Sequence, residues 1–347
     1  MESKERIAKA LAISTDTKVF EMSKGASALV PEVFKNCFAG RKAAIVADIN
    51  TWPVLGEKVY EAMQQAGIPV EKYIIDKEEF HADWKYVEMV DRVIEGDFAA
   101  AKATEDNAEY VDTLPEKLFR EASDEFNVLV SVGSGVINDI GKILSSITGH
   151  RYIIVATAPS MDGYASATSS MARDSLKISL NTRCADVILG DIDILKNAPE
   201  HMLKSGLGDM LAKYVSIAEW RIAHIITGEY YCEQVAQLIR KALKKCVDNA
   251  TGLLKRDEKA VEAVFEGLVI GGVAMAYAGV SRPASGVEHY FSHIWDMRGL
   301  EFGTKVDLHG IQCAKATLVS ARLYDKVKEM SPEPQRAKAY VDAFDYD

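Results

Sequence analysis

The sequence predicts an α/β domain with a parallel sheet, followed by an all-α domain. In the first half, short β-rich runs alternate with helical patterns, and strands joined through helices form parallel sheets. In the second half, from about residue 196, the pattern is helical throughout. No flexible linker separates the halves. We therefore expect an N-terminal domain over 1–195, a C-terminal domain over 196–347, and a fixed cleft between them where a ligand binds.

Four strands are expected in the first half, at 43–49, 70–76, 127–133 and 151–158. The run at 127–133 is nearly continuous in apolar residues, which is typical of a strand buried on both faces. The acidic insertion at 77–125 is interpreted as solvated helices without chemistry of their own. Residues 164–192 are interpreted as irregular β structure that closes the domain.

The second half contains several long helical patterns. Residues 199–228 begin with proline and are interpreted as a helix, a glycine turn and a second helix. Residues 229–256 continue as helix. Residues 257–279 are apolar nearly all round, which predicts a buried central helix, and small residues such as Gly271 and Gly272 favour close packing against it.

Composition and charge exclude several classes of partner. The net charge of −10 disfavours nucleic acid and anionic membrane surfaces. The N-terminus lacks a secretory apolar segment, and no run reaches the roughly 18 apolar residues of a membrane helix. We expect a cytoplasmic protein without a membrane span. Five scattered cysteines predict reduced thiols rather than disulfides or a thiolate metal site; they are Cys37, Cys184, Cys232, Cys246 and Cys313.

A glycine-rich turn, GSGVINDIGK at 133–142, follows the third strand. Gly133 and Gly135 permit a tight turn, and the following helix N-terminus offers N–H groups that suit a pyrophosphate. The usual dinucleotide fingerprint has a third glycine, where this chain has Asn138, and an acid after the next strand, where it has none. Asp48, after the first strand, is the candidate for the ribose. The turn is therefore either a nucleotide loop or only a tight strand–helix connection.

Three of the seven histidines fall within 289–309. His289 and His293, four apart on a helix, share one face, and such a pair binds a metal, relays a proton or packs in a core. A catalytic metal site has three protein ligands and an open position. His309 is expected at the start of the final helix, and Asp209 near a helix start, where it is either a ligand or an N-cap.

Five segments together resemble a known family. GSGVINDIGK, TAPSMDGYAS, GLGDMLAKYVSIAEW, SRPASGVEHYFSH and LHG occur in the order and approximate spacing of the sn-glycerol-1-phosphate dehydrogenases. These belong to the iron-containing alcohol dehydrogenase and dehydroquinate synthase-like superfamily, and the chain is most similar to the bacterial branch associated with arabinose operons. The resemblance covers roughly 20–325 and implies a dehydroquinate synthase-like fold, with a Rossmann-like nucleotide-binding domain and a helical domain that binds metal and substrate.

The resemblance implies metal ligands at Asp209, His289 and His309. Where related alcohol dehydrogenases have a fourth histidine ligand, this chain has Lys213. The cofactor contacts implied by the resemblance are Asp48, Gly133, Ser134, Gly135, Val136, Ile137, Asp139, Thr157, Ser160 and Ser166.

Five residues are assigned to the substrate or its chemistry: Asp162, Asp209, His293, Lys213 and Arg282. Asp162 and His293 match positions near the substrate, and His293 is the candidate proton relay because histidine titrates near neutral pH. Lys213 and Arg282 are the candidate cations for a substrate phosphate.

The implied reaction is the reduction of dihydroxyacetone phosphate to sn-glycerol 1-phosphate by NADH or NADPH, with one divalent metal, zinc or nickel. Asp48 beside the ribose favours NADH. We expect a homo-oligomer, a dimer or larger. Two rival classes stay open. The first is a glycerol or other polyol dehydrogenase, or a lyase of the same fold. The second is a non-catalytic binding protein, since the chain ends at VDAFDYD where the family continues with further helices.

Overall fold

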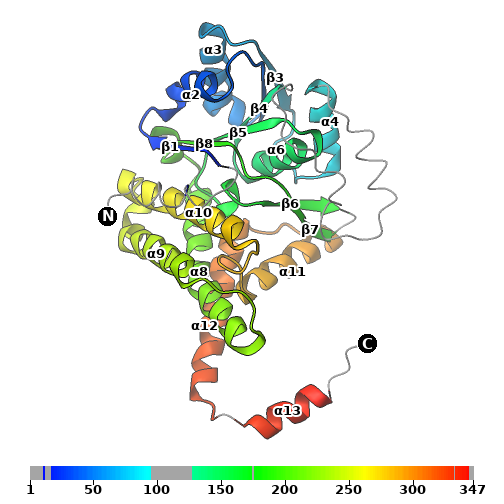
Figure 1. The fold of residues 1–347 in the computed structure, drawn as a ribbon, viewed down its shortest axis with the longest axis vertical. Helices are drawn as coiled ribbons and strands as arrows, with labels where there is room; N and C mark the ends of the chain where they lie inside the picture. The colour runs from blue at the N-terminus through cyan, green and yellow to red at the C-terminus, as the bar shows by residue number, and fades with distance from the viewer. Residues whose placement is uncertain (1–10, 12–16, 95–126, 174–175, 332, 344–347) are drawn as a thin grey trace.

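The computed structural model describes residue 11 and residues 17–94, 127–173, 176–331 and 333–343 (Figure 1). The first half contains β1 (Val19–Ser23), η1 (Ala26–Leu29), α2 (Val30–Cys37), β2 (Ala43–Asp48), η2 (Trp52–Gly56), α3 (Glu57–Gln65), β3 (Val70–Ile75), α4 (Trp84–Ile94), β4 (Val128–Gly133), α6 (Gly135–Thr148), β5 (Arg151–Ala156), η4 (Asp162–Tyr164), β6 (Thr168–Arg173), β7 (Leu176–Asn181), β8 (Val187–Asp191) and α7 (Ile192–Leu195). The second half contains α8 (Glu200–Thr227), α9 (Glu233–Leu253), α10 (Glu258–Ala278), α11 (Val287–Phe302), α12 (His309–Glu329) and α13 (Pro334–Asp342).

A six-stranded parallel sheet forms the centre of the first half, in the order β1-β8-β5-β4-β2-β3. The four expected strands are confirmed as β2, β3, β4 and β5. The sequence interpretation missed β1 and did not place β8 in this sheet. Within 164–192, β6 and β7 form a separate antiparallel pair. Of the acidic insertion, α4 is helical as expected, and 95–126 lies outside the described residues.

The strand order places a switch point between β2 and β4. The chain moves outward from β2 to β3 in one direction, and from β4 through β5 to β8 in the other. Ligands of open α/β sheets bind beyond the carboxyl ends of the strands at such a point. The parallel register Val46↔Ser131, continued by two residues, brings Asp48 level with Gly133. The sheet therefore places these two predicted cofactor residues side by side.

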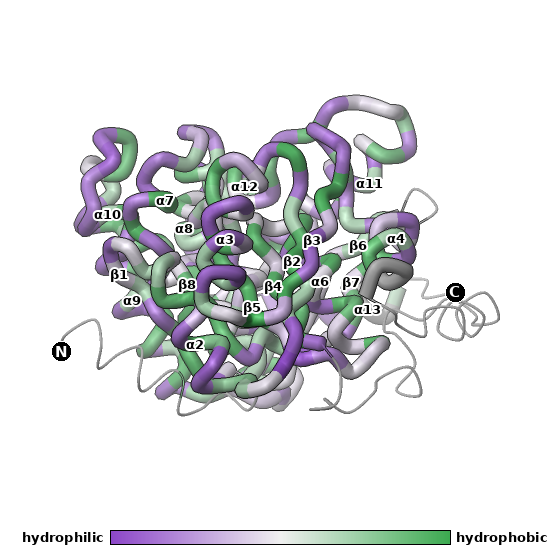
Figure 2. The backbone as a smooth tube through the Cα atoms, turned by 90° about the horizontal axis from the view of Figure 1, so that it is seen from above, coloured by the Kyte–Doolittle hydropathy of each residue, from purple (hydrophilic) through white to green (hydrophobic). Residues whose placement is uncertain are grey.

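The two faces of the sheet pack against different helices. Ala44 and Val46 of β2 belong to a core cluster with α6 and α10, whereas Ala43 and Ile45 belong to a cluster with α2 and α3. This alternation follows from the two-residue period of a strand. Figure 2 shows hydrophobic residues along β2 and β4 and more hydrophilic residues along α2 and α3.

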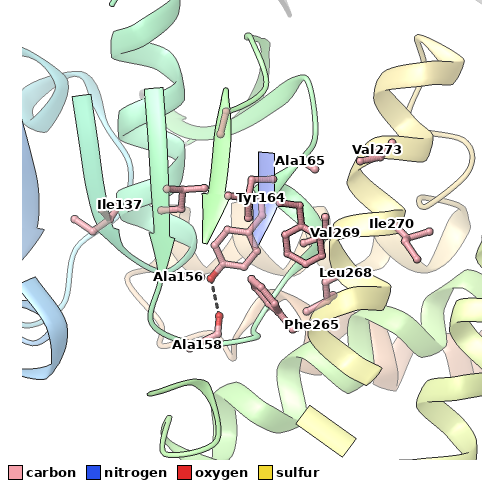
Figure 3. Packing of buried hydrophobic residues seen from close by; sticks show 14 of the residues in the cluster. Ile137, Ala156, Ala158, Tyr164, Ala165, Phe265, Leu268, Val269, Ile270 and Val273 are labelled. Atoms are coloured by element: carbon pink, nitrogen blue, oxygen red, sulfur yellow. Dashed lines mark hydrogen bonds between the residues drawn. The ribbon is translucent and has the colours of Figure 1, made fainter. Parts of the chain in front are cut away.

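The core of the first half continues into the helical half without interruption. Tyr164 of η4 packs edge-on against Phe265 of α10, with ring centroids 5.4 Å apart, and its hydroxyl donates to the Ala158 carbonyl at 2.6 Å (Figure 3). The same cluster runs through α8, α9 and α10. The segment from Ala158 to Tyr164 is thereby held between the sheet and the helices. The division at 195 and 196 stays a prediction.

Helix α8 is a single helix, so the predicted glycine turn is wrong. Gly206 and Gly208 lie inside it, and both are sites of close backbone approach rather than turns. A Cβ on Gly206 would lie 1.8 Å from the Pro159 carbonyl oxygen, and one on Gly208 would lie 2.2 Å from that of Gly310. Asp209 is consequently in mid-helix and is not an N-cap. The glycines bring α8 against η4's loop and against the start of α12, which carries His309.

In the described part of the chain, one helix is long and apolar enough to cross a membrane by composition, namely α10. Of its most apolar window, 78% is buried inside the protein. This is the pattern of a core helix and agrees with the central helix predicted at 257–279.

Candidate active site

A buried network of two carboxylates and one lysine lies between η4 and α8. Lys213 donates from Nζ to Asp162 Oδ2 at 2.5 Å and to Asp209 Oδ1 at 2.7 Å, and its side chain is fully buried. The Asp162 backbone N–H donates to Asp209 Oδ2 at 2.9 Å. Asp209 and Lys213, four apart on α8, share a face, which is why one lysine can bridge both acids. Three residues assigned from the resemblance are thus in direct contact.

One ammonium group serves two buried carboxylates. Burial lowers the pKa of Lys213, but Asp162 and Asp209 outweigh it, so the net direction is upward and the lysine is the cation. Burial, and then the charge of Asp209, raise the pKa of Asp162 above its ordinary value although Lys213 lowers it. The network is therefore held together by charge, and removing any one of the three residues would leave an uncompensated buried charge.

Two glycines of α10 allow Asp162 to reach this position. A Cβ on Gly272 would lie 2.7 Å from the Asp162 carbonyl oxygen, and one on Gly271 would lie 3.6 Å from Asp162 Oδ2. The sequence predicted close packing against this helix, and the element that packs there is η4.

His289 and His309 come together from α11 and α12, with ring centroids 5.0 Å apart. The Nδ1 atom of His289 is 2.7 Å from Glu288 Oε1, and that of His309 is 2.9 Å from Ser292 Oγ. Because Nδ1 is engaged on both rings, Nε2 is the atom each ring can offer to a metal. Groups bonded to the other ring nitrogen orient metal-binding histidines in this way. The sequence interpretation missed Glu288 as the partner that orients His289. Its position directly before His289 in the sequence is the signal that could have pointed to it.

A third donor joins the two histidines. Ligand atoms of His289, His309 and Cys313 all lie within 4.8 Å of one another, and they form the one such group found in the described part of the chain. The expectation that no cysteine lies in a metal site stays a prediction, and Cys313 is the position where the structure offers an alternative. Asp209, the carboxylate ligand implied by the resemblance, is outside this group and accepts hydrogen bonds at both oxygens.

The protonation of the three site histidines differs. Burial, followed by Lys177 and His289, lowers the pKa of His309 far below its usual value, so this ring is neutral, as a ligand must be. Burial also lowers the pKa of His289, but Cys313 and Glu288 raise it to about 10, so this ring carries a proton at neutral pH that a metal would have to displace. His293 has a pKa lowered to about 4 by burial and by Lys177, so it does not titrate near neutral pH as expected.

His293 nevertheless lies beside the predicted metal ligands. Its ring centroid is 6.3 Å from that of His309, and it follows His289 by one turn of α11.

Lys177 of β7 is a cation near the histidines that the sequence interpretation missed. It lowers the pKa of both His293 and His309, and it pairs with Asp296 of α11. By contrast, Arg282 forms a two-point ion pair with Glu229, at 2.8 and 3.3 Å. The ion pair and hydrogen bond recorded for Arg282 among the described residues both go to Glu229, not to a histidine or to Asp162.

The glycine turn predicted from the sequence lies between β4 and α6. A Cβ on Gly133 would lie 2.6 Å from that of Ile137, so glycine is needed there for close packing. Ser134 Oγ and Ser160 Oγ are 2.7 Å apart, and the Thr157 N–H donates to the Gly133 carbonyl at 3.0 Å. The turn and the segment after β5 thus form one surface at the carboxyl edge of the sheet.

Asn138, at the position of the third glycine in the usual fingerprint, has a structural role. Its Nδ2 donates to the Gly163 carbonyl at 3.1 Å, and its Oδ1 accepts from the Tyr152 hydroxyl at 3.1 Å. The departure from the fingerprint therefore ties α6 to η4.

Asp48 closes a turn after β2. Its Oδ1 accepts the backbone N–H groups of Asn50 and Thr51, both at 2.8 Å. This geometry fixes the carboxylate at the switch point.

Ser166 and Lys142 are buried behind the glycine turn, next to the partly buried Asp139. Lys142 is fully buried and donates to the Gly163 carbonyl at 2.9 Å and to Ser166 Oγ at 3.1 Å. Asp139 lies 3.6 Å from Lys142 Nζ, and burial raises its pKa. Ser166 is 2% exposed, so in this structure it holds Lys142 rather than lining a surface.

Comparisons with known proteins agree with this architecture. The family model described as iron-containing alcohol dehydrogenase matches residues 21–199. Glycerol-1-phosphate dehydrogenase [NAD(P)+] of Halalkalibacterium halodurans is 32% identical, covering 81% of this chain and 64% of its own. The enzyme of that name from Hyperthermus butylicus is 34% identical, covering 87% and 77%.

Solved structures show the same fold. The glycerol dehydrogenase of Schizosaccharomyces pombe matches with a TM-score of 0.65 at 19% identity, over 90% of this chain and 72% of that one. The chain spans 64% and 66% of the lengths of two of its curated relatives, from Halalkalibacterium halodurans and Bacillus velezensis. The family match and the relatives together show that this chain belongs to the iron-containing alcohol dehydrogenase family.

Proposed function

We propose that this protein is a metal-dependent oxidoreductase that reduces dihydroxyacetone phosphate to sn-glycerol 1-phosphate with NADH or NADPH. The observation that carries the proposal is the pair of oriented imidazoles, His289 and His309, with a glycine turn at the switch point of a parallel sheet in the same chain. The curated relatives bear the name glycerol-1-phosphate dehydrogenase [NAD(P)+], which supports the choice of substrate and cofactor.

The donor set fits a divalent transition metal. Two imidazoles with engaged Nδ1 atoms leave Nε2 for zinc or nickel, both of which we propose as candidates. Asp209 stays the proposed carboxylate ligand, since each of its oxygens keeps a lone pair beyond the hydrogen bond it accepts. When bound, the metal supplies Lewis-acid polarisation of the ketone oxygen.

The remaining residues bind and orient. We assign the glycine turn, Gly133 to Ile137, together with Thr157 and Ser160, to the cofactor pyrophosphate, and Asp48 to the ribose. A carboxylate there favours NADH, because it repels the 2′-phosphate of NADPH. His293 is neutral at working pH, so it orients the substrate or passes a proton through its two nitrogens rather than storing one.

The buried network has a positioning role in this proposal. Because Asp162 and Asp209 already neutralise Lys213, we do not assign its ammonium to the phosphate. Asp162 stays the candidate for a substrate hydroxyl.

A direct assay tests the function. Purified protein loaded with Zn²⁺ or Ni²⁺ is expected to oxidise NADH when dihydroxyacetone phosphate is added, and the absorbance of NADH measures the rate. Glycerone and glycerol, as non-phosphorylated substrates, are expected to react much more slowly. Faster turnover of glycerol than of the phosphate ester would favour the polyol dehydrogenase, and no turnover of any substrate would contradict an oxidoreductase.

Lys177 is the cation we assign to the substrate phosphate, because it lies near His293 and His309. It also pairs with one carboxylate, Asp296, whereas Lys213 pairs with two. Lys177→Met is expected to raise KM for dihydroxyacetone phosphate by about 10–100-fold, the value of one charged hydrogen bond. The KM for glycerone should stay within about twofold, because that substrate has no phosphate. The control is Lys315→Met, whose exposed lysine pairs with Asp307 at 3.1 Å. Equal effects on both substrates would remove the phosphate role.

A further inference from the structure

The Cys313 thiol lies against the two histidines of the proposed metal site. Cys313 follows His309 by four residues on α12, so both side chains lie on one face of that helix. Its Sγ is 3.6 Å from His309 Nε2 and 3.9 Å from Nδ1, and its side chain is fully buried. The donors of His289, His309 and Cys313 are mutually within 4.8 Å.

Two other buried thiols of the chain have different surroundings. Cys246 Sγ donates to the Ala263 carbonyl at 3.1 Å, and Cys184 Sγ donates to the Ala165 carbonyl at 3.2 Å. The partners recorded for the Cys313 thiol within the described residues are the rings of His309 and His289. Cys246 and Cys184 thus donate to backbone carbonyls, whereas the thiol of Cys313 lies against the imidazole of a proposed metal ligand.

The separation of the two donor atoms matches joint coordination. Zinc binds imidazole nitrogen at about 2.0–2.1 Å and thiolate sulfur at about 2.3 Å, so at a tetrahedral angle the two atoms lie about 3.6 Å apart. Sγ and Nε2 of this pair are 3.6 Å apart. The Nε2 atom is also the one left available, because Ser292 engages Nδ1.

We infer that Cys313 is a ligand of the metal ion that His289 and His309 would hold, so that the site contains one sulfur donor beside two imidazoles. With Asp209 the site would have four protein donors, and a substrate oxygen would enter as a fifth ligand. On binding, the thiol releases its proton to solvent and a metal–sulfur bond forms. A thiolate makes the site softer and favours zinc, nickel or cobalt over magnesium or manganese. This inference rests on the metal dependence in the proposed function and adds the identity of one ligand.

Cobalt(II) provides a spectroscopic test independent of activity. The full-length protein is stripped with a chelator and titrated with Co²⁺, while absorbance and bound cobalt per chain are measured. We expect a thiolate-to-cobalt charge-transfer band in the near ultraviolet that saturates at one cobalt per chain. In Cys313→Ser and Cys313→Ala this band should vanish. Co²⁺ should also bind at least about tenfold more weakly, because replacing a residue that only hydrogen-bonds to a ligand already lowers metal affinity by about that factor.

Control variants separate ligation from folding. Cys246→Ala also removes a buried thiol, and it should keep the charge-transfer band. Far-ultraviolet circular dichroism checks that each variant is folded. If the Cys313 variants do not fold, the presence or absence of the charge-transfer band in the wild-type protein still tests whether a thiolate binds the metal.

The outcomes distinguish the inference from the function on which it rests. Wild-type protein that binds Co²⁺ without a charge-transfer band overturns the Cys313 assignment and leaves the metal-dependent function intact. A band that persists in folded Cys313→Ala also overturns it. Wild-type protein that binds no Co²⁺ contradicts both the metal site and the inference.

Discussion

Replacing His309 with alanine is expected to abolish metal binding and the proposed reductase activity together. The ring offers Nε2 from the first residue of α12, and the closest partners of that ring are His289, Ser292 and Cys313. Loss of Lewis-acid stabilisation costs several kcal/mol in the transition state, so turnover should fall by a factor of about 1,000 or more. Elemental analysis of the purified protein measures the metal, and NADH oxidation measures the rate.

His201→Ala is the matched control for this variant. His201 is an exposed histidine near the start of α8, and its removal should leave metal content and rate unchanged. A His309→Ala protein that keeps both its metal and its activity would show that the ligand assignment is wrong. Loss of activity with full metal content would instead give His309 a role in chemistry or substrate binding.

The second large effect is expected for Lys213→Met, measured as the free energy of unfolding in urea with a chelator present. The variant leaves Asp162 and Asp209 buried without a compensating cation. Breaking a buried ion pair by removing one partner costs about 3–5 kcal/mol. We expect a loss of this size, at unchanged m-value.

The same helix offers a control for the burial argument. Lys204 pairs with Glu200 at 2.5 Å with the same four-residue spacing, but both side chains are about half exposed. Lys204→Met should therefore cost less than about 1 kcal/mol. Combining Asp162→Asn with Lys213→Met should recover part of the loss, because it removes one uncompensated charge. Equal costs for the two lysines would show that the network is not held by buried charge.

The strands of the sheet could be predicted from local pattern, whereas the role of the α8 glycines could not. Apolar runs at 43–49 and 127–133 identified β2 and β4 because a strand buried on both faces has almost no polar residues. Gly206 and Gly208 suggested a break, yet α8 continues through them. Their function depends on the carbonyls of Pro159 and Gly310, which approach from far along the chain.

The sequence by itself determined the alternating β/α order of the first half, the helical second half, the glycine turn after β4 and the histidines of α11 and α12. These features are local, since periodicity and spacing set them within a few residues. Only the tertiary structure decided that Lys213 is neutralised by two acids, and that Lys177 and Cys313 lie beside the histidines. Those relations depend on how separate elements pack, because a charge or a thiol acquires its chemistry from the neighbours that folding brings to it.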